Sequence, residues 1–588
     1  MTATFRRAQG PPGVPKSVML RPRVREAGDA ALLIELPARI DPMTNAAVLR
    51  LAEIVHAAGL KGVRDVVPAI RSLAVFYDPL HADVESLRAL FAGRSLEPDM
   101  ASEGRRHEVP VVYGGDAGLD LEEIASASGI SPEELIARHS GRDYRVYMLG
   151  FLPGFAYLGT LDPSIVAPRR SVPRLKVPAG AVGVAGRQTG IYPRECPGGW
   201  ALLGRTSLKM FDADSRTPAR FAPGDRVRFV PVASVDLAAD GLDYAGSEDP
   251  AHVRHDAGSK DPAYVPQAQG ARSKDPACVL EIRRGGLMTT VQDSGRWGHQ
   301  RDGVSVSGAM DRVAHRVANA LVGNESTAAT LEVTMIGPEV ICLRDVVIAV
   351  TGADLSPRVG QQPVPLDQAV PLAAGSVLSF GLRRQGARAY VAFAGGIDVP
   401  VVLGSRATHT PSDLGGLGGR PLRAGDRLVL RQRGPLPSRR VSGPVTRLMA
   451  GGARVRILPG PQVESFPSDA LASLTQSRFV VSTESNRMGY RLKGSSVPVP
   501  AGEMISDVTF PGAVQVPPSG EPILLMADRQ TAGGYAQLAI VISADMPLAG
   551  QLAPGDWVQF ELTTRSEAIA ALVEQERALQ HLEGHAFA

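Results

Sequence analysis

The feature that most constrains this sequence is a turn-and-strand unit that occurs three times. In each copy a Gly-Asp pair is followed by a segment that alternates in hydropathy, over residues 221–229, 422–430 and 552–560. A Gly-small-Val step precedes the Gly-Asp pair by 44, 50 and 43 residues, at Gly180, Gly375 and Gly512. Gly-containing turns before alternating segments are typical of hairpins and barrels. The spacing therefore predicts three related β-units.

Length and composition favour several β-rich domains. The chain has 588 residues, more than one hydrophobic core usually supports. Its 63 glycines and 47 prolines are typical of many turns between short strands. The 63 Lys and Arg residues nearly balance the 60 Asp and Glu residues, so the sequence lacks the basic footprint of a nucleic-acid-binding protein. We expect a mainly β protein whose partner is a small molecule or another protein.

The cysteines and the absence of targeting signals favour a cytoplasmic protein. Cys196, Cys278 and Cys342 are far apart and show no paired metal-binding spacing, which suits buried thiols in a reducing compartment. No apolar run approaches the ~20 residues that a membrane-spanning helix needs. Residues 1–16 are rich in Arg, Pro and Gly and lack the apolar centre of a signal peptide. We therefore expect no membrane association.

A polar stretch between Gly241 and Cys278 marks the main division of the chain. It contains two near-identical pentapeptides, at 259–263 and 273–277, and no apolar periodicity. Such sequence is typical of a flexible tether. We interpret residues 236–277 as a linker between two proteins that were once separate.

The expected fold class is mainly β with an N-terminal α/β domain. Hydropathy patterns predict strands at 30–36, 63–67 and 73–77 and helices at 45–58 and 82–91 in a small α/β sandwich. Ser307 is the predicted cap of a later helix, and Ser566 the predicted start of a C-terminal one. The expected segments are a disordered leader (1–20), the sandwich (21–105), a barrel (106–235), the linker (236–277), two further barrels (278–435 and 436–562) and the C-terminal helix (563–588).

Catalytic signatures of common enzymes are absent from the sequence. It has no Gly-Lys-Ser/Thr phosphate loop, no His-Glu-x-x-His motif and no nucleophile elbow. Lys209 lies between Leu208 and Met210, but the surrounding residues do not match those of a biotin carrier. We therefore expect no biotin attached to this chain.

One dense motif in the first half favours a binding site. Two Gly-Phe steps at 150–151 and 154–155 provide backbone that can approach a ligand beside apolar walls. A cluster of Arg and Lys residues follows, and such side chains give charge-assisted hydrogen bonds to carboxylate or phosphate. The candidate binding residues here are Phe151, Gly154, Phe155, Tyr157, Arg169, Arg174, Lys176, Arg187 and Gln188.

These motifs carry a resemblance to known families. The first half, from Arg23 to about Val232, resembles the allophanate hydrolase subunit 1 family, which contains the B-type subunit of 5-oxoprolinase and a sporulation-kinase inhibitor. The second half, from Val279 to about Phe560, resembles the allophanate hydrolase subunit 2 family, which contains the C-type subunit of 5-oxoprolinase. Its motifs include Gln292-Asp293-Ser294-Gly295-Arg296-Trp297-Gly298, Asn486-Arg487-Met488-Gly489-Tyr490 and Asp528-Arg529-Gln530-Thr531. The resemblance implies cyclophilin-like barrels, one before the linker and two after it.

The chain departs from the pattern of the second family at three positions. Asn486 stands where Asp is common, and Ala532 and Ala536 stand where Thr and Pro are common. The departures concern the last barrel, where they bear on the identity of the substrate.

The resemblance implies a component of an ATP-dependent 5-oxoprolinase, a hydrolase that acts on a cyclic amide. ATP would phosphorylate the lactam oxygen, and water would then open the ring to glutamate. The implied cofactors are ATP and Mg²⁺, and the implied partner is a separate protein that resembles the A-type subunit of 5-oxoprolinase. Contact between the two halves of the chain is expected, and we also consider a homodimer. The alternatives are a biotin-dependent carboxyltransferase that acts on urea or a related amide, and a non-catalytic regulator of a histidine kinase.

Residue roles follow from the resemblance. Arg169, Arg174, Lys176 and Arg187 would bind phosphate or a substrate carboxylate, while Asp293 and Asp354 would hold Mg²⁺ or act as a base. Arg529, Gln530 and Thr531 would orient the ring amide. Arg296, Arg406 and Tyr535 complete the expected binding residues. Because neither half holds a complete catalytic set, we expect the reacting centre near the interface between them.

Overall fold

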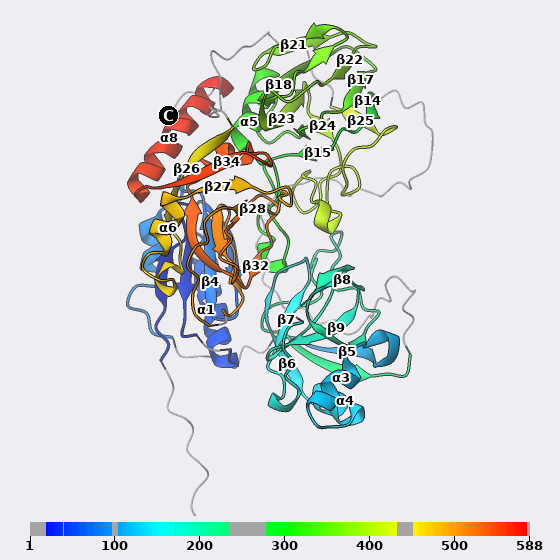
Figure 1. The fold of residues 1–588 in the computed structure, drawn as a ribbon, viewed down its shortest axis with the longest axis vertical. Helices are drawn as coiled ribbons and strands as arrows, with labels where there is room; N and C mark the ends of the chain where they lie inside the picture. The colour runs from blue at the N-terminus through cyan, green and yellow to red at the C-terminus, as the bar shows by residue number, and fades with distance from the viewer. Residues whose placement is uncertain are drawn as a thin grey trace, which may run out of the picture.

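The computed structural model describes residues 19–38, 40–96, 104–170, 172–234, 278–431, 451–502 and 504–584. Nearly all of the predicted leader and the whole predicted linker lie outside the described residues. The rest is mainly β, as predicted, and contains two closed seven-stranded barrels. Figure 1 shows the sandwich (blue) beside the last barrel (orange), with the first barrel (cyan) on the other side of the molecule.

The N-terminal sandwich is a four-stranded antiparallel sheet with two helices. Its strands have the order β1-β2-β4-β3, namely β1 (Arg23–Glu26), β2 (Ala31–Glu35), β4 (Ser72–Tyr77) and β3 (Val63–Pro68). Helix α1 (Pro42–Ala58) begins after Asp41, whose side chain accepts a hydrogen bond from the Thr44 amide, and α2 spans Val84–Ala89. All predicted elements are present, because their apolar periodicity is strong; α1 begins earlier than Asn45 since Asp41 and Pro42 supply its cap.

The first barrel closes through a parallel pair of strands. Strand β13 (Arg226–Pro231) follows the Gly224-Asp225 turn and pairs parallel with β5 (Arg106–Tyr113) and antiparallel with β6 (Asp143–Leu149). The other strands are β7 (Ala156–Gly159), β9 (Ala181–Ala185), β10 (Gln188–Ile191) and β12 (Ala201–Arg205). Helices α3 (Leu121–Ala127) and α4 (Pro132–Ser140) cover one side, and β8 (Arg174–Val177) pairs with β11 (Cys196–Gly198) outside the barrel.

The last barrel repeats the same closure. Strand β34 (Trp557–Leu562), after the Gly555-Asp556 turn, pairs parallel with β26 (Gly452–Pro459) and antiparallel with β27 (Arg478–Val481). The barrel also contains β28 (Gly489–Lys493), β30 (Ala513–Val516), β31 (Ile523–Leu525) and β33 (Ala536–Val541). Helix α6 (Ala470–Gln476), helix α7 (Met546–Gly550) and the short pair β29 (Asp507–Val508) and β32 (Ala532–Gly533) lie between these strands in sequence.

The unit from 278 to 431 differs from the expected third barrel, because its described residues form two open sheets. Strand β25 (Arg427–Leu430) does follow a Gly-Asp turn, but it pairs antiparallel with β14 (Cys278–Arg284) and β24 (Ile397–Asp398). That seven-stranded sheet also holds β17 (Glu339–Cys342), β19 (Arg358–Val359), β20 (Gln362–Pro363) and β22 (Val377–Ser379). The five-stranded sheet holds β15 (Met288–Gln292), β16 (Thr330–Thr334), β18 (Val346–Asp354), β21 (Ala369–Leu372) and β23 (Gln385–Phe393).

Two helices join this unit to the last barrel. Helix α5 (Arg312–Leu321) is capped by Asp311 and not by Ser307, whose hydroxyl instead donates to Asp528 at 2.7 Å. Helix α8 (Arg565–Glu583) begins just before the predicted Ser566 and is capped by Thr564, in a capping box with Glu567. Arg316 on α5 is bound to Glu576 and Glu583 on α8. The C-terminal helix is therefore anchored to the second half.

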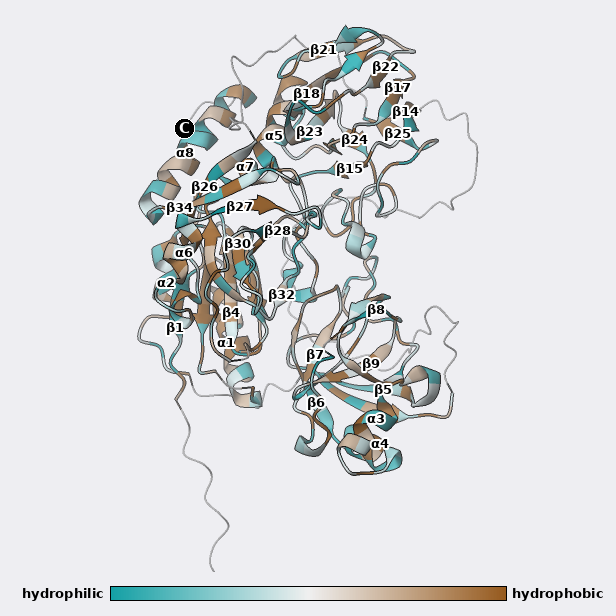
Figure 2. Cartoon of the chain, in the orientation of Figure 1, coloured by the Kyte–Doolittle hydropathy of each residue, from teal (hydrophilic) through white to brown (hydrophobic). Residues whose placement is uncertain are grey.

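Apolar residues from both halves form one continuous core. Leu33 and Phe76 of the sandwich, Phe155 of the first barrel, and Phe510 and Ile540 of the last barrel belong to the same buried cluster. Figure 2 shows brown, apolar strands in the interior of the sandwich and of the last barrel. Within the described part of the chain, no helix is long and apolar enough to cross a membrane. The halves thus fold against each other, which the sequence predicted.

Candidate functional site

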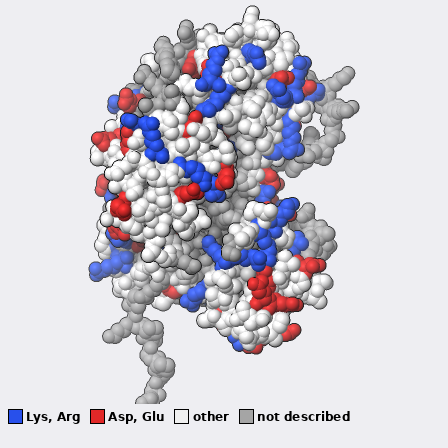
Figure 3. Space-filling model, viewed as in Figure 1, with Lys and Arg blue, Asp and Glu red and all other residues white. Residues whose placement is uncertain are grey.

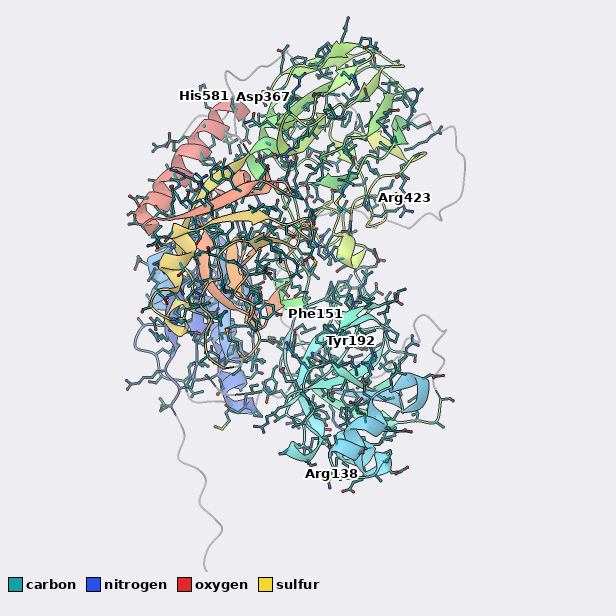
Figure 4. The ribbon with its side chains drawn as sticks, viewed as in Figure 1. Arg138, Phe151, Tyr192, Asp367, Arg423 and His581 are labelled. Atoms are coloured by element: carbon teal, nitrogen blue, oxygen red, sulfur yellow. The ribbon has the colours of Figure 1, made fainter. Side chains whose placement is uncertain are left out.

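The loop between β6 and β7, residues 150–155, joins the first barrel to the second half; we call it the junction loop. The Gly154 amide donates to the Asp302 carbonyl at 2.9 Å, a hydrogen bond between the halves. Within the loop, the Gly150 amide donates to the Phe155 carbonyl at 3.1 Å. Figure 4 shows Phe151 on the side of the first barrel that faces the second half. The Gly-Phe motif thus lies at the interface, where the reacting centre was expected.

Glycine is required at two positions because the backbones approach so closely. A Cβ on Gly150 would lie 2.4 Å from the Ala532 Cβ, and one on Gly303 would lie 2.4 Å from the Leu152 carbonyl oxygen. Real Cβ atoms do not approach other atoms this closely, so each side chain would force the halves apart. The glycine-rich motifs therefore serve the contact between the halves.

Aromatic side chains form the wall behind the junction loop. Phe155 packs edge-to-face against Tyr157, Tyr192 and Trp200, with ring centroids 5.0, 5.3 and 5.4 Å away. Phe151 packs against Phe155 at 5.5 Å. Burial raises the pKa of Tyr157 to about 12, so its hydroxyl stays protonated at neutral pH. The wall can accordingly donate a hydrogen bond from an apolar surface.

Arg169 and Tyr535 lie near this wall from opposite halves. The Arg169 side chain is exposed, and it has no ion pair or hydrogen bond within the described ranges. Its Nη1 atom lies 3.8 Å from where a Cβ on Gly534 would stand, next to the 45% exposed Tyr535. Its positive charge also acts on the Tyr157 hydroxyl. The structure therefore brings together Arg169, Tyr157 and Tyr535, as well as the junction loop.

Two buried polar atoms lack partners, and one of them, the Thr531 hydroxyl, lies at the interface. The Thr531 hydroxyl, 1% exposed, lies 3.4 Å from the Cβ position of Gly150 and makes no hydrogen bond. The Gln188 Nε2 atom on β10 is likewise buried without an acceptor. Unsatisfied buried groups cost free energy, on the order of 1–3 kcal/mol each. Such groups are available to bind a ligand or water.

The Arg529 side chain, predicted to orient the ring amide together with Gln530 and Thr531, is buried in the protein. Its guanidinium donates to Gln300 Oε1 at 2.5 Å, and Gln300 donates in turn to Asp65 of the sandwich at 3.2 Å. Burial and the nearby charge of Arg312 lower the pKa of Arg529 to about 9. Gln530 is half-buried, and its carbonyl accepts from the Thr509 hydroxyl. The Arg529 side chain therefore links three segments and does not reach the exposed surface.

Asp293, Arg296 and Arg406 form a separate group that holds the loop around residue 405. The Asp293 carboxylate accepts hydrogen bonds from the Ser405 hydroxyl and the Arg406 amide, each at 2.6 Å. The Arg296 guanidinium, fully buried, donates to the Val402 and Ala407 carbonyls. These bonds fix the position of one loop. They engage both Asp293 oxygens, which gives this carboxylate a structural role in the loop.

The remaining predicted residues lie elsewhere. Asp354 ends β18 and accepts from the Ser356 amide at 2.8 Å, which stabilises a turn of the five-stranded sheet. Arg174 forms two hydrogen bonds with the buried Asp120, at 2.7 and 2.9 Å. Lys176 pairs with Glu195 at the surface, and Arg187 is exposed on the first barrel. No group of three metal-binding side chains occurs among the residues that the structure describes.

Sequence reasoning missed the buried ion pairs near the site. Arg487 and Asp528 lie in the motifs at 486–490 and 528–531, but the sequence predicted no role for either side chain. A motif does not show which side chains are buried together. His409 is 3% exposed, and neither of its ring nitrogens has a partner. The departure at Asn486 is conservative, since its side chain accepts from the Met488 amide as an Asp would.

The exposed Arg169 lies beside a nucleophile-poor surface at the junction. Figure 3 shows Lys and Arg side chains on the part of the first barrel nearest to the second half. Such a site can stabilise negative charge on a carboxylate or phosphoryl group by charge-assisted hydrogen bonds. The geometry therefore favours chemistry in which anionic charge develops on the substrate.

Two family descriptions match the chain and together span most of it. Residues 22–221 match the carboxyltransferase domain, subdomains C and D, and residues 302–562 match the carboxyltransferase domain, subdomains A and B. The chain belongs to this carboxyltransferase-domain family, with C and D before A and B. The two resemblances inferred from the motifs are confirmed.

The relatives divide along the same line. The second half is 39% identical over 305 residues to the C-type subunit of 5-oxoprolinase from Escherichia coli, covering 52% of this chain and 97% of that protein. The first half is 39% identical over 232 residues to the B-type subunit of 5-oxoprolinase from Bacillus subtilis, covering 37% of this chain and 97% of that protein. Urea amidolyase of Lachancea kluyveri is 31% identical over 334 residues, covering 52% of this chain and 18% of that enzyme.

Crystal structures of one protein match both halves at once. The crystal structure of the protein TTHA0988 aligns with 92% of this chain and 100% of its own, at 36% identity and a TM-score of 0.76. This chain therefore shares the arrangement of its two halves with TTHA0988, which contains both halves in one chain.

Proposed function

We propose that this chain is the fused B-type and C-type component of an ATP-dependent 5-oxoprolinase, which converts 5-oxo-L-proline to L-glutamate together with a separate A-type subunit. One observation carries the proposal: two consecutive parts of the chain match the B-type and C-type subunits over 97% of their lengths. The hydrogen bond between Gly154 and Asp302 supports it, because it joins the two parts directly.

The proposed reaction requires activation of a stable lactam. The γ-phosphoryl group of ATP moves to the lactam oxygen, and water then attacks the ring carbon. The C–N bond breaks and the nitrogen takes up a proton, which leaves an acyl phosphate on the former ring carbon. A second water molecule hydrolyses this acyl phosphate, so that the products are glutamate, phosphate and ADP. In this proposal Mg²⁺ acts as the counter-ion of the ATP phosphates.

The junction residues suit the charge that develops in this reaction. Arg169 would bind the substrate carboxylate or the transferred phosphoryl group, since its guanidinium is exposed and unpaired in the described structure. The Thr531 hydroxyl would hydrogen-bond the ring amide, because it is buried without a partner. The aromatic wall would exclude water from the apolar part of the ring.

The decisive experiment measures glutamate formation from 5-oxo-L-proline and ATP, with an A-type partner added to the purified chain. We expect activity only with both proteins and ATP present. The separately expressed halves, mixed with the partner, should restore part of the activity, since each half contributes to the junction. Full activity with only one half and the partner would contradict a shared site.

A second candidate rests on the match to urea amidolyase, whose matching region covers 52% of this chain. In that case the chain would transfer a carboxyl group from a biotin carrier to urea or a related amide. The corresponding assay adds a biotin carboxylase, a biotinylated carrier, ATP, bicarbonate and urea. Carboxylated product in that assay, without glutamate formation in the first one, would replace the primary proposal.

A further inference from the structure

A cavity lies away from the junction loop. It has a volume of about 510 Å³ and is enclosed by the sandwich, the last barrel, α5 and α8. No residue of the junction loop lines it. His81, whose side chain is 68% exposed, stands at its rim, so the cavity communicates with solvent. Its volume is that of a small-molecule site, for which roughly 300–1,000 Å³ is usual.

Arg312 points its charge into this cavity without a counter-ion. It is the first residue of α5, and neither an ion pair nor a hydrogen bond engages its guanidinium within the described part of the chain. The adjacent Asp311 is engaged elsewhere, with Ala314 at 2.9 Å and Gln551 at 2.8 Å. The Arg312 side chain is accessible to water inside the cavity, yet the protein around it lowers its guanidinium pKa to about 10.

None of the acidic side chains that line the cavity pairs with Arg312. Arg64 also lines the cavity, and its positive charge acts against Arg312. The acidic lining residues are each bound to other groups: Asp29 to Ser543, Asp78 to Arg64 and Glu576 to Arg316. The Arg312 guanidinium is exposed to the cavity without an acidic partner, so it is free to pair with an anionic ligand.

An aromatic surface accompanies the charge. Trp297 lies beneath both guanidinium groups, 5.3 Å from Arg64 and 5.9 Å from Arg312. Phe76 stands 6.3 Å from Trp297 and 5.5 Å from Phe510, and all three rings line the cavity. Met310 and Ile540 extend the apolar wall. A flat or apolar molecule fits these walls better than a fully hydrated ion does.

We propose that this cavity binds a small organic monocarboxylate with a planar or apolar body, whose carboxylate pairs with Arg312 and whose body packs against Trp297. One free guanidinium matches one carboxylate in a two-point hydrogen-bonded pair. A phosphate dianion would need a second free cation, and Asp78 already binds Arg64 at 2.6 Å. The site is independent of the proposed 5-oxoprolinase activity, because none of its contacts involves the junction loop.

The test measures binding to the full chain. Benzoate, indole-3-carboxylate and 5-oxo-L-proline serve as carboxylate probes, benzamide as the neutral control and inorganic phosphate as the competing anion. Calorimetry gives the Kd, and the shift in Tm and the intrinsic tryptophan fluorescence, to which Trp297 contributes, give independent readouts. We expect at least one carboxylate to bind saturably and to raise Tm, while benzamide and phosphate do not.

Two variants separate the site from a structural role of the arginine. Arg312→Met should weaken carboxylate binding at least tenfold and leave the Tm of the free protein unchanged or higher, since it removes an uncompensated charge. Arg478→Met is the matched control, because Arg478 stacks 4.4 Å over another tryptophan, Trp557, in the last barrel; its binding should equal that of the parent.

Four results would overturn the proposal. The first is the lack of saturable binding by any of the carboxylates, and the second is equal binding by the parent and Arg312→Met. The third is a preference for phosphate or benzamide, because either would contradict a carboxylate on Arg312. A large fall in the Tm of free Arg312→Met would show a structural arginine and would also refute the assignment.

Discussion

Arg487 and Asp528 form a two-point ion pair inside the protein, with Nε–Oδ2 and Nη2–Oδ1 distances of 2.9 and 3.0 Å. Their side chains are 5% and 1% exposed. Arg487 also binds Glu332 of the five-stranded sheet, and Glu332 accepts from the Tyr390 hydroxyl at 2.7 Å. Burial opposes the charge on Asp528, but Arg487 and Ser307 hold the pKa of this carboxyl below its usual value. The network fixes the last barrel against the two-sheet unit.

Replacing Arg487 by Met should strongly destabilise the chain. Asp528 and Glu332 would remain buried without their cation, which typically costs about 3–5 kcal/mol. Urea unfolding of the parent and the variant measures this loss. Arg491→Met is the control, since Arg491 lies four residues further along the chain, on β28, and its side chain is 56% exposed; its change should stay within ~0.5 kcal/mol. Equal stability of the two variants would contradict the structural role of the network.

Asp367 predicts a pH dependence of stability. Burial raises the pKa of its carboxyl to about 6 from an ordinary value of 3.8. The folded chain therefore holds this proton more tightly than the unfolded chain does, and stability falls as the pH rises from about 4 to about 6. Asp367→Asn should remove this contribution, and Asn tolerates the positive φ of 54° at this position.

The expected gain is modest because part of the side chain meets solvent. We expect Asp367→Asn to be about 1 kcal/mol more stable than the parent at pH 7, with no difference near pH 3. Unfolding measured at several pH values tests this, with the exposed Asp116→Asn as the control. A variant less stable than the parent at pH 7 would show that the charged form of Asp367 is favoured.

Substitution of Arg169 should lower activity without a change in stability, whereas substitution of Arg174 should lower stability. Arg169→Gln should lower kcat/KM for glutamate formation roughly 10- to 100-fold and leave Tm unchanged, because its guanidinium has no partner in the described structure. Arg174→Gln should instead lower stability by about 1–2 kcal/mol, since Asp120, 4% exposed, would keep only Arg170 and the Leu202 amide as partners. Unchanged kinetics of Arg169→Gln would remove this residue from the site.

Local turn chemistry was predictable from the sequence, but strand pairing was not. Gly224, Gly425 and Gly555 all adopt positive φ, at 100°, 88° and 89°, as the repeated turn requires. Closure depends on a partner strand far away in the sequence: β34 pairs parallel with β26, whereas β25 pairs antiparallel with β14. For that reason the described residues from 278 to 431 form two open sheets and not the closed barrel that the repeat predicted. No local pattern distinguishes the two pairings.

The same limit applies to the sites. The junction loop was found because its Gly-Phe steps are adjacent in the sequence. The cavity at Arg312 was missed because it forms where Arg64, Trp297, Phe510 and Leu579 meet, from four distant segments. Likewise, both Ser307 and Asp311 are good helix caps, and only the packing of Ser307 against Asp528 decides between them.

The contact between Gly150 and Ala532 gives the sharpest test of how the halves meet. Gly150 does not have a positive φ, so alanine fits its backbone, and the cost of Gly150→Ala comes from the 2.4 Å approach to the Ala532 Cβ. Overpacking of this kind typically costs about 1–3 kcal/mol. The loss should appear in urea unfolding of the full chain and in a weaker Kd between the separated halves.

Ala532→Gly should rescue Gly150→Ala, because the next-nearest atoms to the new Cβ, Ala532 N and Thr531 Oγ1, both lie at an ordinary 3.4 Å. Ala532→Gly alone should cost roughly 1 kcal/mol, as expected for glycine in a strand. The double variant should therefore be more stable than the sum of the single changes, with a coupling of at least ~1 kcal/mol. Ala536→Gly, at another buried position of the last barrel, is the control and should show no coupling with Gly150→Ala. Additive effects for the Gly150 and Ala532 pair would mean that the junction loop relaxes away from the second half, and the interface would then not be held by this contact.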